Sequence, residues 1–364
     1  MEHSVLQPTE EPVDTALSHN ASVYPNDALA SAQIGVVAIG RNEGDRLIRC
    51  LDSLRKHLPA AVPIIYVDSG STDNSVAEAH ARNVRVVCLD MSIPFTGARA
   101  RNAGLDYLLQ HFPDTEYVQF IDGDCELLPE WMPAAVSALD ASPETAVVFG
   151  RLRERFPNAS FYNQLADIEW DNPVGETDMC GGISLMRTAL VRAVGSFNAA
   201  MICGEEPELC IRLRLQGWKI HCIDADMALH DMDMHRFSQW WKRSVRGGWA
   251  VAEGAAKYGH LPEKYMQRES MSGWFWGASL PLLSLGLAAS THGLTILLCL
   301  FVYSLLMVKI YTHRQQDGEV RKKSFVYAFF CTLSKLPQAI GQAKYWLNRW
   351  QRKPAVLIEY KSAK

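Results

Sequence analysis

The chain has 364 residues, of which 48% are hydrophobic and 21% charged, with a formal net charge of −4. These values indicate a folded protein of one large or two ordinary domains and exclude a disordered chain. The slightly acidic balance gives no basis for nucleic-acid binding, so we predict no nucleic-acid partner. The nine cysteines form no C-x-x-C pair and show no zinc-like spacing, which favours reduced thiols in a cytosolic domain.

Residues 1–32 are rich in acids, Pro, Ser and Asn and lack the basic and apolar segments of a signal peptide, so we expect a disordered tail. From residue 33 onward, apolar runs alternate with amphipathic segments. The runs typical of buried strands cover residues 33–39, 63–67, 84–89 and 117–121, with helices predicted at 47–58 and 97–109. This alternation predicts a doubly wound α/β sheet, whose ligands bind beyond the carboxyl ends of the strands.

Two of these strands end in carboxylates. Asp68 follows the second strand, and Asp122-Gly123-Asp124 follows the strand at 117–121. Two carboxylates at i and i+2 can approach one hard divalent cation, and the glycine between them lets a ligand come close. A solvated turn explains the same three residues equally well when they are taken alone. The strand-end rule nevertheless predicts that Asp68 and the aspartate pair lie in one crevice.

The second half of this region continues the alternation. Further strands are predicted at 147–150, 183–187 and 218–223, and helices at 205–215 and 237–249. The strand at 183–187 follows a loop with paired glycines, Gly181 and Gly182. The helix at 205–215 begins with the acidic sequence Gly204-Glu205-Glu206.

Residues 270–308 contain no charged side chain, a run of 39 residues. Because a transmembrane helix needs about 20 apolar residues, we predict two short spans near 275–289 and 294–308. Lys and Arg flank both outer ends, so the positive-inside rule places both in the cytoplasm and makes the pair a re-entering hairpin. A buried helical pair in a soluble protein is the alternative. Residues 324–341 predict an interfacial helix.

The order of motifs resembles that of the family 2 glycosyltransferases. The resemblance extends from about residue 34 to residue 248 and rests on the following segments: Arg41-Asn42-Glu43, Val67-Asp68-Ser69-Gly70, Ala100-Arg101-Asn102, Asp122-Gly123-Asp124 as the D-x-D motif, Cys180-Gly181-Gly182, Gly204-Glu205-Glu206-Pro207, Arg212-Leu213 and His230.

This resemblance implies an inverting enzyme with the GT-A fold, a Rossmann-like doubly wound sheet, which the C-terminal helical membrane hairpin predicted above would follow. It implies transfer of one sugar from a UDP-, GDP- or dTDP-sugar to a hydroxyl of a glycan or lipid-linked acceptor, with Mg²⁺ or Mn²⁺ as cofactor. The expected division is a GT-A domain at 33–250, a linker and hairpin at 251–311, and a cytoplasmic or interfacial tail at 312–364. We expect the enzyme at the inner membrane, with its catalytic domain facing the cytoplasm, in lipid-linked glycan or envelope polysaccharide synthesis.

The resemblance also implies roles for individual residues. The metal would be held by Asp124, Asp122 and His230. The donor nucleotide would meet Asp68, Arg101, Asp122, Arg41 and Glu43. Gly181 and Gly182 would lie on the acceptor side, and the catalytic base would be Glu206 or Glu205. A metal would neutralise the departing diphosphate, and a positioned carboxylate would take the acceptor proton.

Other functions remain possible interpretations of the sequence. A sugar-phosphate nucleotidyltransferase would need a Gly-rich basic loop after the first strand, and residues 40–44 form a poor version of one. A non-catalytic membrane protein of glycan assembly would not need to keep the acids. The segment Gln239-Trp240-Trp241-Lys242-Arg243 lacks the order of the Q-x-x-R-W motif of processive synthases, which favours single-sugar addition. Arg243 and Arg246 would contact either the diphosphate or anionic lipid.

Overall fold

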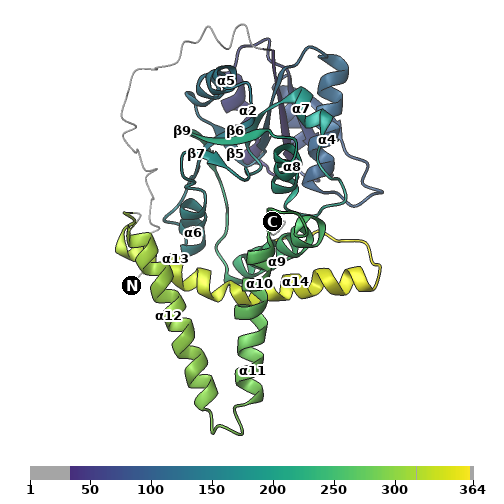
Figure 1. The fold of residues 1–364 in the computed structure, drawn as a ribbon. Helices are drawn as coiled ribbons and strands as arrows, with labels where there is room; N and C mark the ends of the chain where they lie inside the picture. The colour runs from purple at the N-terminus through teal and green to yellow at the C-terminus, as the bar shows by residue number, and fades with distance from the viewer. Residues whose placement is uncertain (1–32, 317, 361–364) are drawn as a thin grey trace, which may run out of the picture.

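The computed structural model describes residues 33–316 and 318–360, so the predicted tail at 1–32 lies outside the described residues. An α/β body contains the strands (Figure 1), and helices from the C-terminal third of the chain lie across its base. Two of these helices project away from the body as a hairpin.

Within the described residues, nine strands form one sheet, ordered β3-β2-β1-β4-β8-β6-β9-β5, with β7 paired to β9. The strands are β1 (Ile34–Gly40), β2 (Ile64–Asp68), β3 (Arg85–Cys88), β4 (Tyr117–Asp122), β5 (Cys125–Leu127), β6 (Thr145–Glu154), β7 (Gly175–Thr177), β8 (Ser184–Arg187) and β9 (Lys219–His230). The strands β1 to β4 pair in parallel, as predicted. The rest of the sheet is mixed, because β8 runs antiparallel to β4 and β6, and β5 and β7 run antiparallel to β9. The expectation of a doubly wound sheet is therefore correct only for the first half.

Helices of the body are α2 (Asp45–His57), α3 (Ser75–Ala81), α4 (Gly97–His111), α5 (Trp131–Ala141), α6 (Phe161–Glu169), α7 (Thr188–Ala193) and α8 (Glu205–Arg214). Leu47, Leu51 and Leu54 of α2 are fully buried, as their spacing on one helix face requires. On α4, a side chain at Gly104 would collide with Val37 and Val67, so this glycine lets the helix pack closely on β1 and β2.

The register of the sheet brings the predicted acids to one edge. Gly40 of β1 lies beside Asp68 of β2, and Ile39 lies beside Asp122 of β4, so both carboxylates stand at the carboxyl edge of parallel strands. The two acids therefore lie at the same edge of the sheet, as predicted. One prediction was wrong in extent: the strand at 218–223 continues to His230 as β9, which sets His230 opposite Cys125 of β5.

Four helices form a layer below the body, which we call the helical platform: α9 (Phe237–Tyr258), α10 (Gln267–Trp274), α13 (Arg321–Leu333) and α14 (Lys335–Trp350). Glycines allow its helices to touch at backbone distance: a side chain at Gly248 of α9 would collide with Gln338 of α14, and one at Gly277 with Lys335. The predicted interfacial helix at 324–341 is in fact two helices that meet at Ser334.

The projecting hairpin consists of α11 (Leu280–Gly286) and α12 (Leu294–Gln316), and a π-helical turn (Phe275–Ser279) connects α11 to α10. Among the described residues, α12 is the one helix long and apolar enough to cross a membrane, and only 6% of its most apolar window is buried. The other leg is shorter than the predicted span at 275–289, because the helix stops at Gly286. The Thr295 hydroxyl donates to the Ser284 carbonyl at 2.8 Å and joins the two legs.

Candidate active site

A single buried arginine gathers three carboxylates at the carboxyl edge of the sheet. Arg101 of α4 contacts Asp122 at 2.9 Å, Glu205 at 3.0 Å and Glu206 at 2.9 Å. These four residues, the Arg101 cluster, come from α4, the end of β4 and the first turn of α8. Three carboxylates around one guanidinium leave a net negative charge, so at least one of them is poised to hold a proton.

The chain around the cluster is shaped to fit it. Gly204 takes a left-handed conformation, with a φ of 77°, and turns the chain into α8 so that Glu205 and Glu206 fall in its first turn. Acids are favoured there by the helix dipole. A side chain at Gly182 would lie 3.0 Å from Oδ2 of Asp122 and 3.2 Å from Oε1 of Glu206, whereas Gly181 faces open space.

Glu206 is the member of the cluster with the clearest acid–base character. Burial raises the pKa of Glu206 to about 7; Arg101 opposes this shift, while Glu205 and Asp122 add to it. A carboxylate with a pKa near neutrality is suited to accept and release a proton at physiological pH. Glu205 is almost fully buried against Arg101.

A second group lies two residues further along the chain. Asp124, Cys125 and His230 offer ligand atoms that lie within 4.8 Å of one another, and all three residues are buried. Nε2 of His230 is 3.6 Å from Oδ1 of Asp124. The pairing of β5 with β9 creates this proximity, since His230 stands directly opposite Cys125. Asp122, predicted as a further ligand, accepts a hydrogen bond from Arg101 at 2.9 Å through its Oδ1.

The other nitrogen of His230 faces Glu154, a residue that the sequence did not single out. Nδ1 of His230 is buried without a hydrogen bond and lies 3.8 Å from Oε2 of Glu154. Glu154 is held by Asn163 and by the backbone N–H of Met232. A histidine between a carboxylate and a cation position is the usual arrangement at a metal site. The oxygen of Asp124 and the nitrogen of His230 therefore suit Mg²⁺ or Mn²⁺, whereas the soft thiol of Cys125 does not.

The remaining predicted donor residues lie on the loops after β1 and β2. Asp68 accepts hydrogen bonds from the backbone N–H groups of Gly70 and Ser71, at 3.0 and 2.9 Å. Its side chain therefore stabilises the turn that directly follows β2. Glu43 pairs with Arg46, and Arg41 pairs with Glu359 near the end of the described chain. The structure thus places Arg41, Glu43 and Asp68 at the same edge of the sheet, outside both the Arg101 cluster and the Asp124–His230 group.

Removing Arg101 should destabilise the fold strongly. In an Arg101→Ala variant the buried carboxylate of Glu205 and the partly buried carboxylates of Glu206 and Asp122 would lose their counter-charge, and we expect a loss of about 3–5 kcal/mol in the free energy of unfolding. Urea denaturation measures this loss. Arg192→Ala is the control, because Arg192 and Asp106 form an exposed pair whose loss costs about 1 kcal/mol or less. Equal effects of the two changes would show that the cluster does not hold the body together.

Comparison with known proteins identifies the class. Residues 36–193 match the family model "Glycosyl transferase family 2". This segment of the chain is therefore a family 2 glycosyltransferase domain, and the resemblance carried by the motifs is confirmed for it. Over 90 residues the chain is 36% identical to "Uncharacterized glycosyltransferase YibD" from Escherichia coli (strain K12). The alignment covers 24% of this chain and 25% of the relative's length.

Solved structures of glycosyltransferases share the fold. A mannosyltransferase from Pyrobaculum calidifontis, PcManGT, in complex with GDP-Man and Mn²⁺, superposes with a TM-score of 0.59 at 16% identity, covering 87% of this chain and 88% of that one. S. aureus TarS 1-349 superposes with a TM-score of 0.50 at 15% identity, covering 87% and 92%. At these identities the likeness establishes the GT-A fold and nothing further.

Proposed function

We propose that this protein is a metal-dependent, inverting glycosyltransferase that moves one sugar from a UDP-, GDP- or dTDP-sugar to a hydroxyl acceptor. The observation that carries the proposal is a pair of groups at one sheet edge, linked by the segment Asp122-Gly123-Asp124. One group contains a carboxylate of near-neutral pKa, Glu206, and the other is the buried Asp124–His230 pair. Each group supplies one requirement of glycosyl transfer: a proton acceptor and a site for the diphosphate's cation.

Asp124 and His230 would hold Mg²⁺ or Mn²⁺, with Glu154 orienting the imidazole of His230. When bound, this cation neutralises the charge that develops on the departing nucleoside diphosphate. The mannosyltransferase of the same fold was solved with GDP-Man and Mn²⁺, which supports a nucleotide-sugar and a divalent cation here. Asp68, Arg41 and Glu43 would line the nucleotide side of the crevice.

Glu206 would take the proton from the acceptor hydroxyl. We favour Glu206 over Glu205 because Glu205 is almost fully buried in its ion pair with Arg101, whereas the side chain of Glu206 is somewhat more exposed. Direct displacement with one base inverts the anomeric carbon, so no nucleophile of the enzyme is needed. Gly182 keeps the space beside Glu206 clear for the acceptor.

A turnover screen tests this function. The full chain in detergent is incubated with UDP-, GDP- and dTDP-sugars and Mn²⁺ or Mg²⁺, and the released nucleotide is identified. We expect one donor to release its nucleoside diphosphate only when the metal is present. Conversion of a donor to its nucleoside triphosphate and a sugar 1-phosphate when pyrophosphate is added would instead indicate nucleotidyl transfer. Failure of every donor would support a non-catalytic role.

We further propose that residues 33–250 form the catalytic domain, 251–311 the linker and a membrane hairpin, and 312–364 an interfacial tail on the cytoplasmic side of the inner membrane. Leucines of the hairpin face outward without a protein partner among the described residues, with Leu283 62% and Leu297 65% exposed. The shorter leg, residues 275–286, is about 18 Å long, against about 30 Å of hydrocarbon. The hairpin would therefore enter the membrane and return. Such attachment suits synthesis of a lipid-linked glycan or an envelope polysaccharide.

Charged residues on the hairpin should release the protein from membranes. We expect the double variant Leu283→Glu and Leu297→Glu to move from the membrane fraction to the soluble fraction, because acids inside a bilayer cost about 2–3 kcal/mol each. Ultracentrifugation followed by immunoblotting measures this shift. Leu215→Glu is the matched control, since Leu215 is also exposed, at 49%, but lies on the body. If the double variant sediments with membranes as the wild type does, the hairpin is not the anchor.

A further inference from the structure

The last described segment of the chain returns from the helical platform to the α/β body. Figure 1 shows the chain turning back after α14 toward the body. The reversal begins at Arg352, which adopts a left-handed conformation with a φ of 53°. The backbone N–H of Lys353 donates to the carbonyl of Asn348 at 3.0 Å and closes the turn. We call residues 354–360, which follow this turn and contain no helix or strand, the C-terminal strap.

Apolar side chains attach the strap to the protein. Ala355, Leu357 and Ile358 pack against a buried cluster formed by the segment before α8 and by α9 and α14: Ile202, Cys203, Trp249, Ala252 and Tyr345. Cys203 is two residues before Glu205. The strap is therefore packed beside the segment that leads into the Arg101 cluster.

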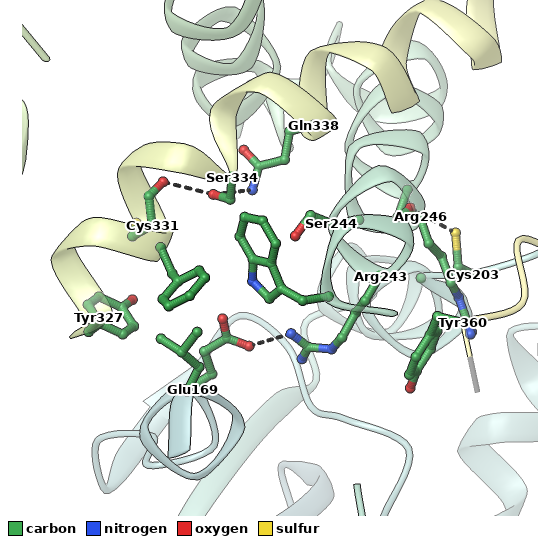
Figure 2. A pocket seen from close by; sticks show the side chains of 16 residues that line it. Glu169, Cys203, Arg243, Ser244, Arg246, Tyr327, Cys331, Ser334, Gln338 and Tyr360 are labelled. Atoms are coloured by element: carbon green, nitrogen blue, oxygen red, sulfur yellow. Dashed lines mark hydrogen bonds and ion pairs between the residues drawn. The ribbon is translucent and has the colours of Figure 1, made fainter. Parts of the chain in front are cut away.

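The last two residues of the strap contact two arginines, one on the body and one on the platform. Glu359 pairs with Arg41, in the loop after β1, at 3.2 Å. Tyr360 lies against Arg246 of α9, whose guanidinium carbon is 5.8 Å from the centroid of the tyrosine ring. Figure 2 shows this contact, in which both side chains line a cavity of about 540 Å³. The strap thus bridges the body and the platform.

The contact with Glu359 satisfies Arg41 only in part. The hydrogen bond to Glu359 uses Nη1 of Arg41, whereas Nε is buried and has no hydrogen-bond partner among the described residues. The guanidinium carbon of Arg41 also lies over the ring of Phe95, 4.7 Å from its centroid, so a second contact fixes its position. A diphosphate carries more charge and more acceptor oxygens than one carboxylate, and it can bond two nitrogens of one guanidinium.

The ion pair between Glu359 and Arg41 is also easy to displace. The side chains of Arg41 and Glu359 are 37% and 53% exposed. Water and salt screen an ion pair of such exposure, so the pair contributes little to stability. A stronger anion can therefore replace Glu359 while the apolar contacts of the strap remain.

We propose that the C-terminal strap is autoinhibitory, and that Glu359 competes with the diphosphate of the donor for Arg41. The contact of Tyr360 with Arg246 holds the end of the strap in place and so raises the local concentration of the Glu359 carboxylate at Arg41. Donor binding exchanges one anion for another at the guanidinium. This inference rests on the proposed function, because it takes Arg41 as a contact of the donor.

Calorimetric titration of the full chain with UDP, GDP and dTDP in Mn²⁺ tests the inference. The variants are Glu359→Gln, Tyr360→Ala, Arg41→Gln and the double variant with both Glu359→Gln and Arg41→Gln. Asp106→Asn is the matched control, because it also removes one negative charge from an exposed ion pair of the body, that of Asp106 with Arg192.

We expect one nucleoside diphosphate to bind Glu359→Gln about two- to fivefold more tightly than the wild type, the range that corresponds to losing one exposed ion pair. Tyr360→Ala should also tighten binding, by about twofold, and Asp106→Asn should match the wild type. The gain should vanish in the Arg41→Gln background, because the competition needs Arg41.

Three results would overturn the autoinhibitory role: equal affinity in Glu359→Gln and the wild type, weaker binding in Glu359→Gln, or a gain of the same size in the Arg41→Gln background. The last would show a long-range effect of charge. Weaker binding would make Glu359 part of the donor site. Unchanged affinity in Tyr360→Ala would overturn the anchoring role of Tyr360.

The same titrations separate this inference from the proposed function. If a nucleoside diphosphate binds the wild type in Mn²⁺ and Glu359→Gln gives no gain, only the strap inference fails. If binding is detected in Glu359→Gln alone, the strap and the donor site are both supported. If no nucleoside diphosphate binds any of these proteins, the proposed donor site fails, and the competition at Arg41 fails with it.

Discussion

Replacing Asp124 by alanine should reduce metal-dependent donor turnover by roughly a hundredfold or more, because the cation would lose its carboxylate ligand and the diphosphate its neutralising charge. Asp124 is the buried carboxylate nearest to His230 among the described residues, with 3.6 Å between the side-chain atoms. Release of nucleoside diphosphate at saturating donor, over a range of Mn²⁺ concentrations, measures this loss.

A partial recovery of turnover in Asp124→Ala at high Mn²⁺ would agree with weakened metal binding. The turnover of Asp124→Asn should lie between that of the alanine variant and that of the wild type. Asp52→Ala is the matched control, since Asp52 pairs with Arg82 on the surface of α2, away from the crevice. Turnover of Asp124→Ala at the rate of Asp52→Ala would contradict a role of Asp124 at the metal.

Replacing Glu206 by glutamine should lower the rate of transfer to the acceptor by about a hundredfold or more, the usual contribution of a general base. Binding of the donor should persist, because the Asp124–His230 group is untouched. The pH profile makes the prediction specific. With a pKa of about 7, Glu206 is protonated and inactive as a base at lower pH. The wild-type rate should therefore rise about tenfold per pH unit below 7 and level off above it.

Other ionisable groups interact electrostatically with Glu206: Arg101, Glu205, Asp122 and Cys180. A second variant is therefore needed to assign the pH profile to Glu206. Glu208→Gln alters a buried acid of the same helix that binds Arg212 and Tyr258. The Glu208→Gln change should lower the free energy of unfolding and leave the pH dependence of the transfer rate unchanged. If Glu206→Gln retains the wild-type rise with pH, another group is the base, and Glu205→Gln becomes the variant to test.

The sequence predicted the parts of the fold that depend on local pattern. The apolar runs ending at Asp68 and Asp122 were correctly placed as parallel strands, because period and strand-end chemistry are local signals. Strand direction is not such a signal: the run at 183–187 was predicted as a strand, but nothing in its composition indicated that β8 would enter antiparallel between β4 and β6. The short strands β5 and β7 owe their existence to pairing with β9.

The same distinction applies to the site. Asp124 and Glu206 were selected because they belong to motifs, and the structure brings each into a group with other ionisable residues. Glu154 was missed, because its only signal is a carboxylate at the end of a strand, and its contact with His230 depends on β6 lying beside β9. The cavity of about 540 Å³ lined by α9 and α13 was also missed, since 62 residues, 259–320, separate the end of α9 from the start of α13.

Calorimetric titration of nucleoside diphosphates tests the division of labour between the two groups most directly. UDP, GDP and dTDP are titrated, with and without Mn²⁺, into the wild type, Asp124→Ala and Glu206→Gln. One of the three should bind the wild type and Glu206→Gln with similar affinity in Mn²⁺, and bind Asp124→Ala about tenfold more weakly or worse. Nucleoside diphosphate affinity that does not depend on Mn²⁺, or that is equal in Asp124→Ala and the wild type, would contradict a donor site built on Asp124 and His230.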